Sequence, residues 1–262
     1  MVLSLLLLAA CNRDQDGGLE NLPTKVSVNE LATAQALTEN APPAGFREPL
    51  AFPAIDQGLE ELSGWRYLVQ MEFEGAFART SRPAQVSTSA EVWFNQIASS
   101  RRVVFETSGS LTDDEEGSTY EAVRMGPDAF LVRENTCLSN AGESAETAAD
   151  LSAGTLIGGV FRAVSAARMA VINGQQAWHY DFTTADLNLP NIVLADGGQV
   201  TATGGELWVA PEHGVAVRFY INLDVENARV FGNQLPVTGQ VIMRYDLFDI
   251  GIVPNISVPF GC

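Results

Sequence analysis

Hydrophobic and polar residues alternate with a period of two along most of the chain after Gly64. From Trp65 to Glu74 nearly every second side chain is large and apolar, and most of those between are polar. This is the pattern of a β-strand with one buried face. The same period recurs further along, and Asn173-Gly174 between two such stretches is a strong hairpin signal. The predicted strands are 65–74, 86–94, 101–107, 119–125, 128–134, 167–172, 176–183, 200–210, 214–226 and 237–248.

Helical spacing of apolar residues is confined to three segments. It is weak at 28–38, and it predicts a short amphipathic helix at 53–63 and one or two helices at 146–165. Long strands joined by tight turns predict an α+β fold, built on one curved antiparallel sheet of about 10–11 strands. Helices would cover its concave face. We favour this open half-barrel over a closed barrel.

The N-terminus carries a processing signal. Residues 1–10 are almost all apolar, and Leu8-Ala9-Ala10-Cys11 fits the lipobox pattern of a branched apolar residue, two small residues and a cysteine. This resembles the signal of bacterial lipoproteins, in which Cys11 is acylated and becomes the mature N-terminus. The alternative is an apolar terminus with a chance cysteine. No basic residue precedes the run, which indicates a true start further upstream.

The expected organisation has three parts. Residues 1–10 are a signal peptide, 11–27 a polar tether with lipidated Cys11, and 28–262 a single domain. No stretch reaches the roughly 20 apolar residues needed to span a bilayer. The protein is therefore expected to be anchored by lipid to the extracytoplasmic face of the cell membrane, in the periplasm or at the cell surface.

Two cysteines remain once Cys11 is acylated. In an oxidising compartment Cys137 and Cys262 are expected to form a disulfide, which would also tie down the C-terminus. Two unrelated buried thiols are the alternative.

The charge balance excludes some partners. The formal net charge is −17, with one lysine and fourteen arginines against 32 acidic residues. Such a surface repels phosphate backbones and anionic headgroups, so nucleic-acid binding and attachment through a polybasic patch are both excluded.

The sequence contains no catalytic signature, and no metal or cofactor is expected. His179 and Asp181 share one face of a strand, and we interpret them as a solvent-facing hydrogen-bonded pair. The acidic run from Asp113 to Gly117 is interpreted as a solvated loop, with a calcium site as the weaker alternative. The protein is therefore predicted not to be an enzyme.

The apolar face of the sheet is the remaining candidate site. It is larger than two short helices readily cover, so a cavity for acyl chains is the functional hypothesis and a filled core is the alternative. The inward-facing residues expected to line it are Trp65, Tyr67, Val69, Met71, Phe73, Phe94, Val217, Phe219, Ile221, Met243 and Tyr245.

The order of elements over roughly residues 50–260 resembles that of the LolA/LppX-type lipoproteins. The resemblance rests on the lipobox, Gly64-Trp65-Arg66-Tyr67, the hairpin with Trp178-His179-Tyr180, and the final strands. It implies an eleven-stranded half-barrel whose concave face, covered by helices, binds lipid or lipoprotein acyl chains. Periplasmic sensor domains that regulate anti-sigma factors share this fold, so the resemblance also implies a sensor function as an alternative to lipid binding.

The leading hypothesis is a monomeric, membrane-anchored lipid-binding or lipid-carrying protein with a further protein partner in the envelope. A tethered sensor or interaction domain with a filled core is the second hypothesis. The sequence does not identify the lipid or the direction of transport.

The first prediction concerns the anchor. Cys11→Ala protein, expressed with a complete signal peptide, should lose its acylation and leave the membrane fraction, because the acylated thiol is gone. Fractionation followed by intact-mass measurement checks this. Unchanged partitioning into membranes would contradict it.

Overall fold

The computed structural model describes residues 41–111, 117–138 and 141–262. The predicted signal peptide, Cys11 with its predicted tether, the helix expected at 28–38 and most of the acidic run at 113–117 lie outside these ranges. No helix in the described part of the chain is both long and apolar enough to cross a bilayer.

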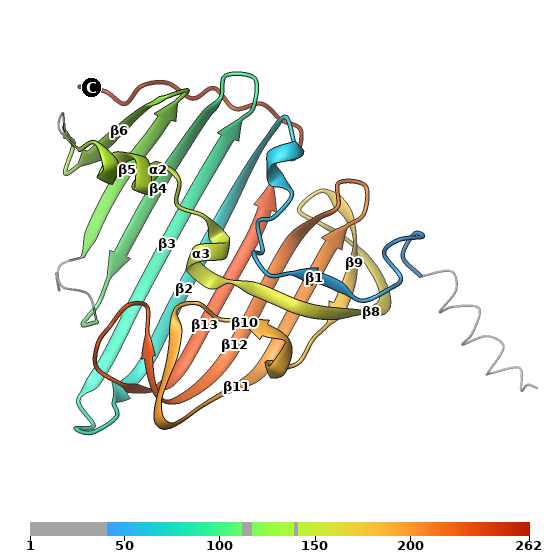
Figure 1. Ribbon diagram of the computed structural model, residues 1–262, viewed down its shortest axis with the longest axis vertical. Coiled ribbons are helices and arrows are strands. Elements are labelled where there is room, and N and C mark those ends of the chain that lie inside the picture. Colours follow the sequence, from blue (N-terminus) through green and yellow to red (C-terminus); the bar gives the residue numbers. More distant parts are fainter. Residues whose placement is uncertain (1–40, 112–116, 139–140) are drawn as a thin grey trace, which may run out of the picture.

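One antiparallel sheet of 13 strands dominates the fold (Figure 1). Its order is β1-β8-β9-β11-β12-β13-β2-β3-β4-β5-β6-β7, with β10 paired to β8, and the two ends do not meet. The predicted open sheet is confirmed. The strands are β1 Leu50–Phe52, β2 Gly64–Phe77, β3 Pro83–Asn95, β4 Ser100–Ser108, β5 Ser118–Met125, β6 Asp128–Arg133, β7 Thr136–Cys137, β8 Gly159–Ile172, β9 Gln175–Asp181, β10 Leu187–Asn188, β11 Ile192–Ala210, β12 Val215–Val230 and β13 Val237–Phe248.

The register brings the alternating apolar residues onto one face. In the middle of the sheet Met71 lies opposite Thr88 on one side and Met243 on the other, and Met243 lies opposite Ile221. The predicted inward face of β2 is confirmed, because Trp65, Tyr67, Val69, Met71 and Phe73 are all buried.

Bulges make the sheet curl. The pairing of β11 with β12 shifts register at three places, and one shift leaves Val217 as an extra residue on β12. An extra residue bends its strand and increases the local twist. The Asn173 side chain donates a hydrogen bond to the Val217 carbonyl at 3.1 Å. The turn of the β8–β9 hairpin is thereby fastened to the bulge.

Two different kinds of cover lie on the concave face (Figure 1). Helix α2 (Glu143–Ala149) packs on β4, β5 and β6 and buries Ala145 and Ala149. At the other end the sheet curls over, so that β1, the first half of β8 and β10 lie in front of β11–β13. Helix α3 (Ala153–Ile157) lies between these covers.

Helix α3 is held by its N-terminus. The Asp56 carboxylate accepts hydrogen bonds from the backbone N–H groups of Ala153 and Gly154 at 2.8 and 2.9 Å, and the Ser152 hydroxyl caps Thr155. These oxygens satisfy N–H groups that have no partner within the helix. Asp56 thus ties α3 to the segment before β2.

The helix predicted at 53–63 is wrong. Ile55 and Leu59 are buried as expected, but only the 3-10 turn Leu59–Glu61 is helical. Gly58 adopts φ +83°, a left-handed conformation that interrupts a helix.

The helices predicted at 146–165 are confirmed only up to Ile157. From Gly159 onward the chain is strand β8. Gly158 has φ +73° and ψ −123°, which no helix accommodates, and a Cβ on Gly159 would lie 2.0 Å from the Phe52 carbonyl oxygen. The two glycines therefore end the helix and let β8 pack tightly against β1.

The predicted disulfide between Cys137 and Cys262 is present. It closes a loop of 125 residues in sequence. The C-terminal segment runs from β13 along one end of the sheet (Figure 1), and Asn95 donates a hydrogen bond to the Pro254 carbonyl on the way. The disulfide thus fixes the C-terminal segment, which follows β13 and pairs with no strand of the described sheet.

Candidate ligand-binding cavity

A cavity of about 710 Å³ opens on the concave face, in the part that neither α2 nor the curled-over strands cover. Its floor is formed by β2, β3 and β4, and its walls by α3, the start of β11 and the 231–235 turn between β12 and β13. The lining residues are Met71, Val86, Thr88, Phe105, Thr107, Leu111, Leu156, Asn191, Phe231, Gly232, Asn233, Gln234 and Leu235. Its volume lies within the range of small-molecule sites.

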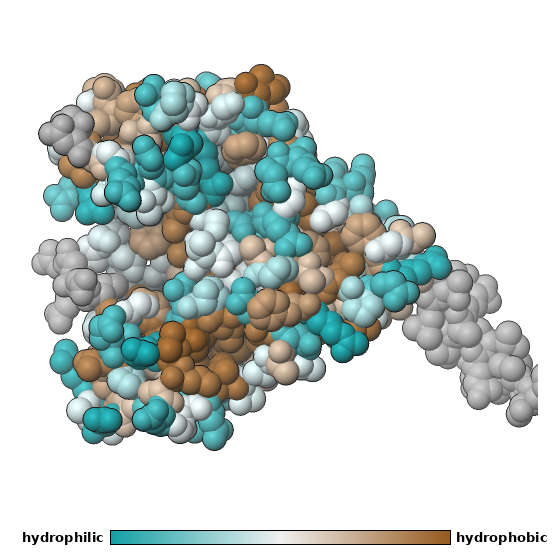
Figure 2. All heavy atoms as spheres, viewed as in Figure 1, coloured by the Kyte–Doolittle hydropathy of each residue, from teal (hydrophilic) through white to brown (hydrophobic). Residues whose placement is uncertain are grey.

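Apolar side chains form the deep part of the cavity and much of its mouth. Met71 and Val86 on the floor are only 3% and 5% exposed, whereas Leu235 at the rim is 59% exposed. Phe105 on β4 stacks on Tyr120, with ring centroids 5.0 Å apart, which holds this part of the floor in place. Figure 2 shows hydrophobic residues gathered across the lower middle of this face.

The polar groups of the lining hold its walls together. The Asn191 amide nitrogen donates to the carbonyls of Thr155 and Leu156 at 2.8 and 2.7 Å, which fastens α3 to the start of β11. Asn233 donates to the Leu111 carbonyl at 3.3 Å, and its own side-chain oxygen accepts from the Leu235 N–H.

The structure places only one of the eleven predicted lining residues, Met71, in this cavity. Trp65 and Phe94 border a separate pocket of about 230 Å³ beside Asp56. Ten of the eleven residues are buried at 3% exposure or less, and Phe94 is half-buried. Their inward direction is confirmed, whereas their contact with a ligand stays a prediction.

Packing explains why most of the predicted set does not line the large cavity. Trp65 stacks on Tyr67 and Phe94 at 5.2 Å, and Tyr67 lies 5.5 Å from Tyr245. The Tyr67 hydroxyl accepts a hydrogen bond from Arg101 at 3.0 Å. Burial raises the pKa of Tyr67 well above its usual value. This cluster fills the concave face beneath α3.

Sequence reasoning missed the walls formed by Phe231 and Leu235. Both lie in the turn between two long strands, where side-chain direction has no fixed period. Phe231 adopts φ +51° and is followed by Gly232 at φ +79°. A large apolar residue beside a glycine in a hairpin turn was the available signal.

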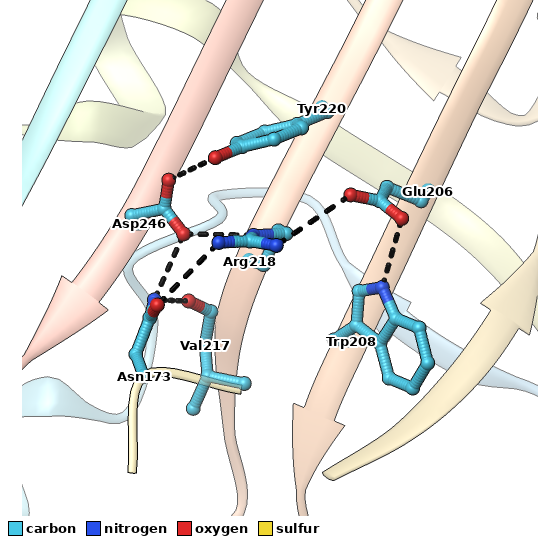
Figure 3. Close-up of polar contacts among 7 residues, drawn as sticks. All are labelled: Asn173, Glu206, Trp208, Val217, Arg218, Tyr220 and Asp246. Carbon is cyan, nitrogen blue, oxygen red and sulfur yellow. Dashed lines mark hydrogen bonds and ion pairs between the residues drawn. The ribbon is translucent and has the colours of Figure 1, made fainter. Parts of the chain in front are cut away.

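A second cluster lies on the opposite, convex face (Figure 3). Arg218 donates to Asp246 at 2.8 Å, and Asp246 also accepts from Asn173 and from the Tyr220 hydroxyl. Burial and the bond to Asp246 raise the pKa of Tyr220 to about 12. The carboxylate is thus occupied by neighbours from β12 and the β8–β9 turn, and the cluster fastens that turn to the sheet.

The interpretation of His179 as solvent-facing is wrong. His179 is only 6% exposed, and its ring lies edge-on to the Trp208 ring, with the centroids 5.0 Å apart. The Arg168 guanidinium lies over the Trp208 ring, 5.3 Å from its centroid. Asp181 lies near, with 3.4 Å between the His179 Nδ1 and a carboxylate oxygen, but this Nδ1 makes no hydrogen bond with any described residue, so the predicted hydrogen-bonded pair is not formed. Burial, with Arg168 nearby, lowers the pKa of His179.

No protein-family model and no curated protein matches the sequence. Solved structures to which the chain is similar include LprF from Mycobacterium bovis, with 11% identity and a TM-score of 0.36 over 87% of this chain and 97% of that chain. A LolA superfamily protein from Nitrosomonas europaea has 12% identity and a TM-score of 0.23, with 79% and 96% covered. A DUF1329 family protein from Desulfovibrio piger has 8% identity and a TM-score of 0.23, with 78% and 95% covered. These likenesses concern the fold alone.

The buried histidine predicts a pH dependence of stability. The pKa of His179 is lowered in the folded state, so below about 6.5 the unfolded chain binds more protons. Folding stability should therefore fall with decreasing pH in this region, by at most about 1.4 kcal/mol per pH unit for one group. His179→Gln should flatten this slope in urea titrations, and the control His213→Gln should keep it. Equal slopes in wild type and His179→Gln would contradict the assignment.

Proposed function

We propose that this protein is a lipid-anchored envelope protein that binds the acyl chains of a lipid in the cavity between β2–β4, α3 and the 231–235 turn. It acts as a monomeric binding or carrier protein and not as an enzyme. The anchor is the acylated Cys11, outside the described residues. A partner protein in the envelope would deliver or receive the lipid.

The cavity is the observation that carries this proposal. It has about 710 Å³ of space, an apolar floor and a rim that includes the exposed Leu235. Exposed apolar surface in a hollow of this size is costly in water and favours an apolar ligand. The Met71 side chain on the floor is flexible enough to adapt to chains of different shape.

The second candidate function is a tethered sensor or interaction domain with a filled core. It is favoured by the dense packing of the other predicted lining residues, among them Tyr67, Phe219 and Tyr245, which are fully buried. Under this alternative the cavity is an unoccupied depression, and the acidic surface would meet a basic protein partner.

Two substitutions on β3 separate the candidates. Val86 and Val92 lie on the same face of this strand, but Val86 borders the cavity and Val92 is fully packed. Val86→Trp should place its ring in the cavity, change the free energy of unfolding by less than about 1 kcal/mol, and abolish lipid binding. Val92→Trp should lose roughly 1–3 kcal/mol through overpacking and, where folded, keep its bound lipid.

The measurements are urea unfolding and the amount of lipid bound per protein. Equal destabilisation by both substitutions, with lipid binding unchanged in Val86→Trp, would show that this cavity is not the lipid site.

A further inference from the structure

The lining of the cavity also restricts the kind of head group that it accepts. Resting on the proposed function, we infer that the ligand is an uncharged lipid of the acylglycerol class, and that the cavity discriminates against anionic lipids such as phosphatidic acid.

Every lining residue that the structure describes is uncharged. Seven are apolar, one is a glycine, and the others are the hydroxyl residues Thr88 and Thr107 and the amide residues Asn191, Asn233 and Gln234. In the sequence, Leu111 is followed by Thr112 and four acidic residues, Asp113–Glu116, and by no basic residue.

The amides have few N–H groups to offer to an anion. The Asn191 side-chain nitrogen is engaged by two backbone carbonyls, and those of Asn233 and Gln234 each donate to one. Thr88 and Thr107 hydrogen-bond to each other at 3.0 Å. The side-chain oxygens of these amide and hydroxyl residues can still accept hydrogen bonds, which suits a head group that carries hydroxyl groups.

Two arginines of the concave face, Arg101 and Arg124, are committed elsewhere. Arg101 donates to the Leu151 carbonyl and the Tyr67 hydroxyl, and Arg124 pairs with Asp150 at 2.6 Å, both in the half that the helical segment covers. Arg229 is exposed and is not among the residues that line this cavity. It borders a smaller pocket of about 220 Å³ on the outer side of the 231–235 turn, which shares four lining residues with the cavity.

An anionic head group inside the cavity would therefore find no counter-charge among the residues that line it. Moving an unpaired charge from water into such a site is unfavourable, whereas an ester or hydroxyl group loses much less. Dioleoylglycerol and dioleoyl phosphatidic acid have the same acyl chains and differ only in the phosphate, so comparing them isolates the effect of charge.

The test measures binding of each lipid, dispersed in the same non-ionic detergent, to the delipidated full-length protein. Dioleoylglycerol should bind at least about tenfold more tightly than dioleoyl phosphatidic acid. Thr107→Lys, which adds a cation on the cavity floor, should raise the affinity for phosphatidic acid about tenfold. Gln234→Lys adds the same charge at the exposed rim and serves if Thr107→Lys does not fold.

Ser108→Lys is the matched control, because it adds the same charge to β4 at an exposed residue outside the cavity lining. It should leave the preference unchanged. Equal wild-type affinity for the two lipids, or no gain of phosphatidic acid binding in either cavity variant, would overturn the inference and leave the proposed function intact. Binding of neither lipid, with no lipid in the protein as purified, would overturn both.

Discussion

The whole structure depends on covering the apolar face of one long antiparallel sheet. Burying that face provides the main driving force for folding, and an uncovered apolar face would also make the protein prone to association. The described part of the chain supplies three short covers: α2, α3 and the curled-over strands β1, β8 and β10. Among these described residues, part of the concave face of β2–β4 is left uncovered, and the cavity lies there.

The position of the covers follows from a few polar contacts. Asp56 caps α3 from the segment before β2, and Asn191 binds the last turn of α3 from the start of β11. On the convex side Asn173 fastens the β8–β9 turn to the bulge at Val217. The contacts of Asp56 and Asn191 hold α3 at both of its ends, and the hollow lies beside it.

Much of the sheet could be predicted from the sequence, and the reason is periodicity. Ten strands are long enough for alternation to be visible, while β1, β7 and β10 have only two or three residues and leave no pattern.

The helix predicted after Gly158 is wrong because the helical spacing of Phe161 and Val164 is a weaker constraint than the backbone conformation of the two glycines before them. Alternation does not predict the cavity walls at Phe231 and Leu235, since a turn places its side chains through its local φ and ψ angles; the pair Phe231-Gly232 is the one signal that the sequence offers there. The exposure of His179 was misjudged because alternation says nothing about Arg168 and Trp208 packing over the convex face.

The central claim is that the cavity holds a lipid in the working protein. Native mass spectrometry of the full chain, purified in mild detergent from a bacterial envelope, tests it most directly. We predict a non-covalent adduct with the mass of one lipid per protein, released by collisional activation, in addition to the covalent modification at Cys11. A population with only the mass of the ligand-free protein, under conditions that keep a known lipid-binding control loaded, would contradict the account.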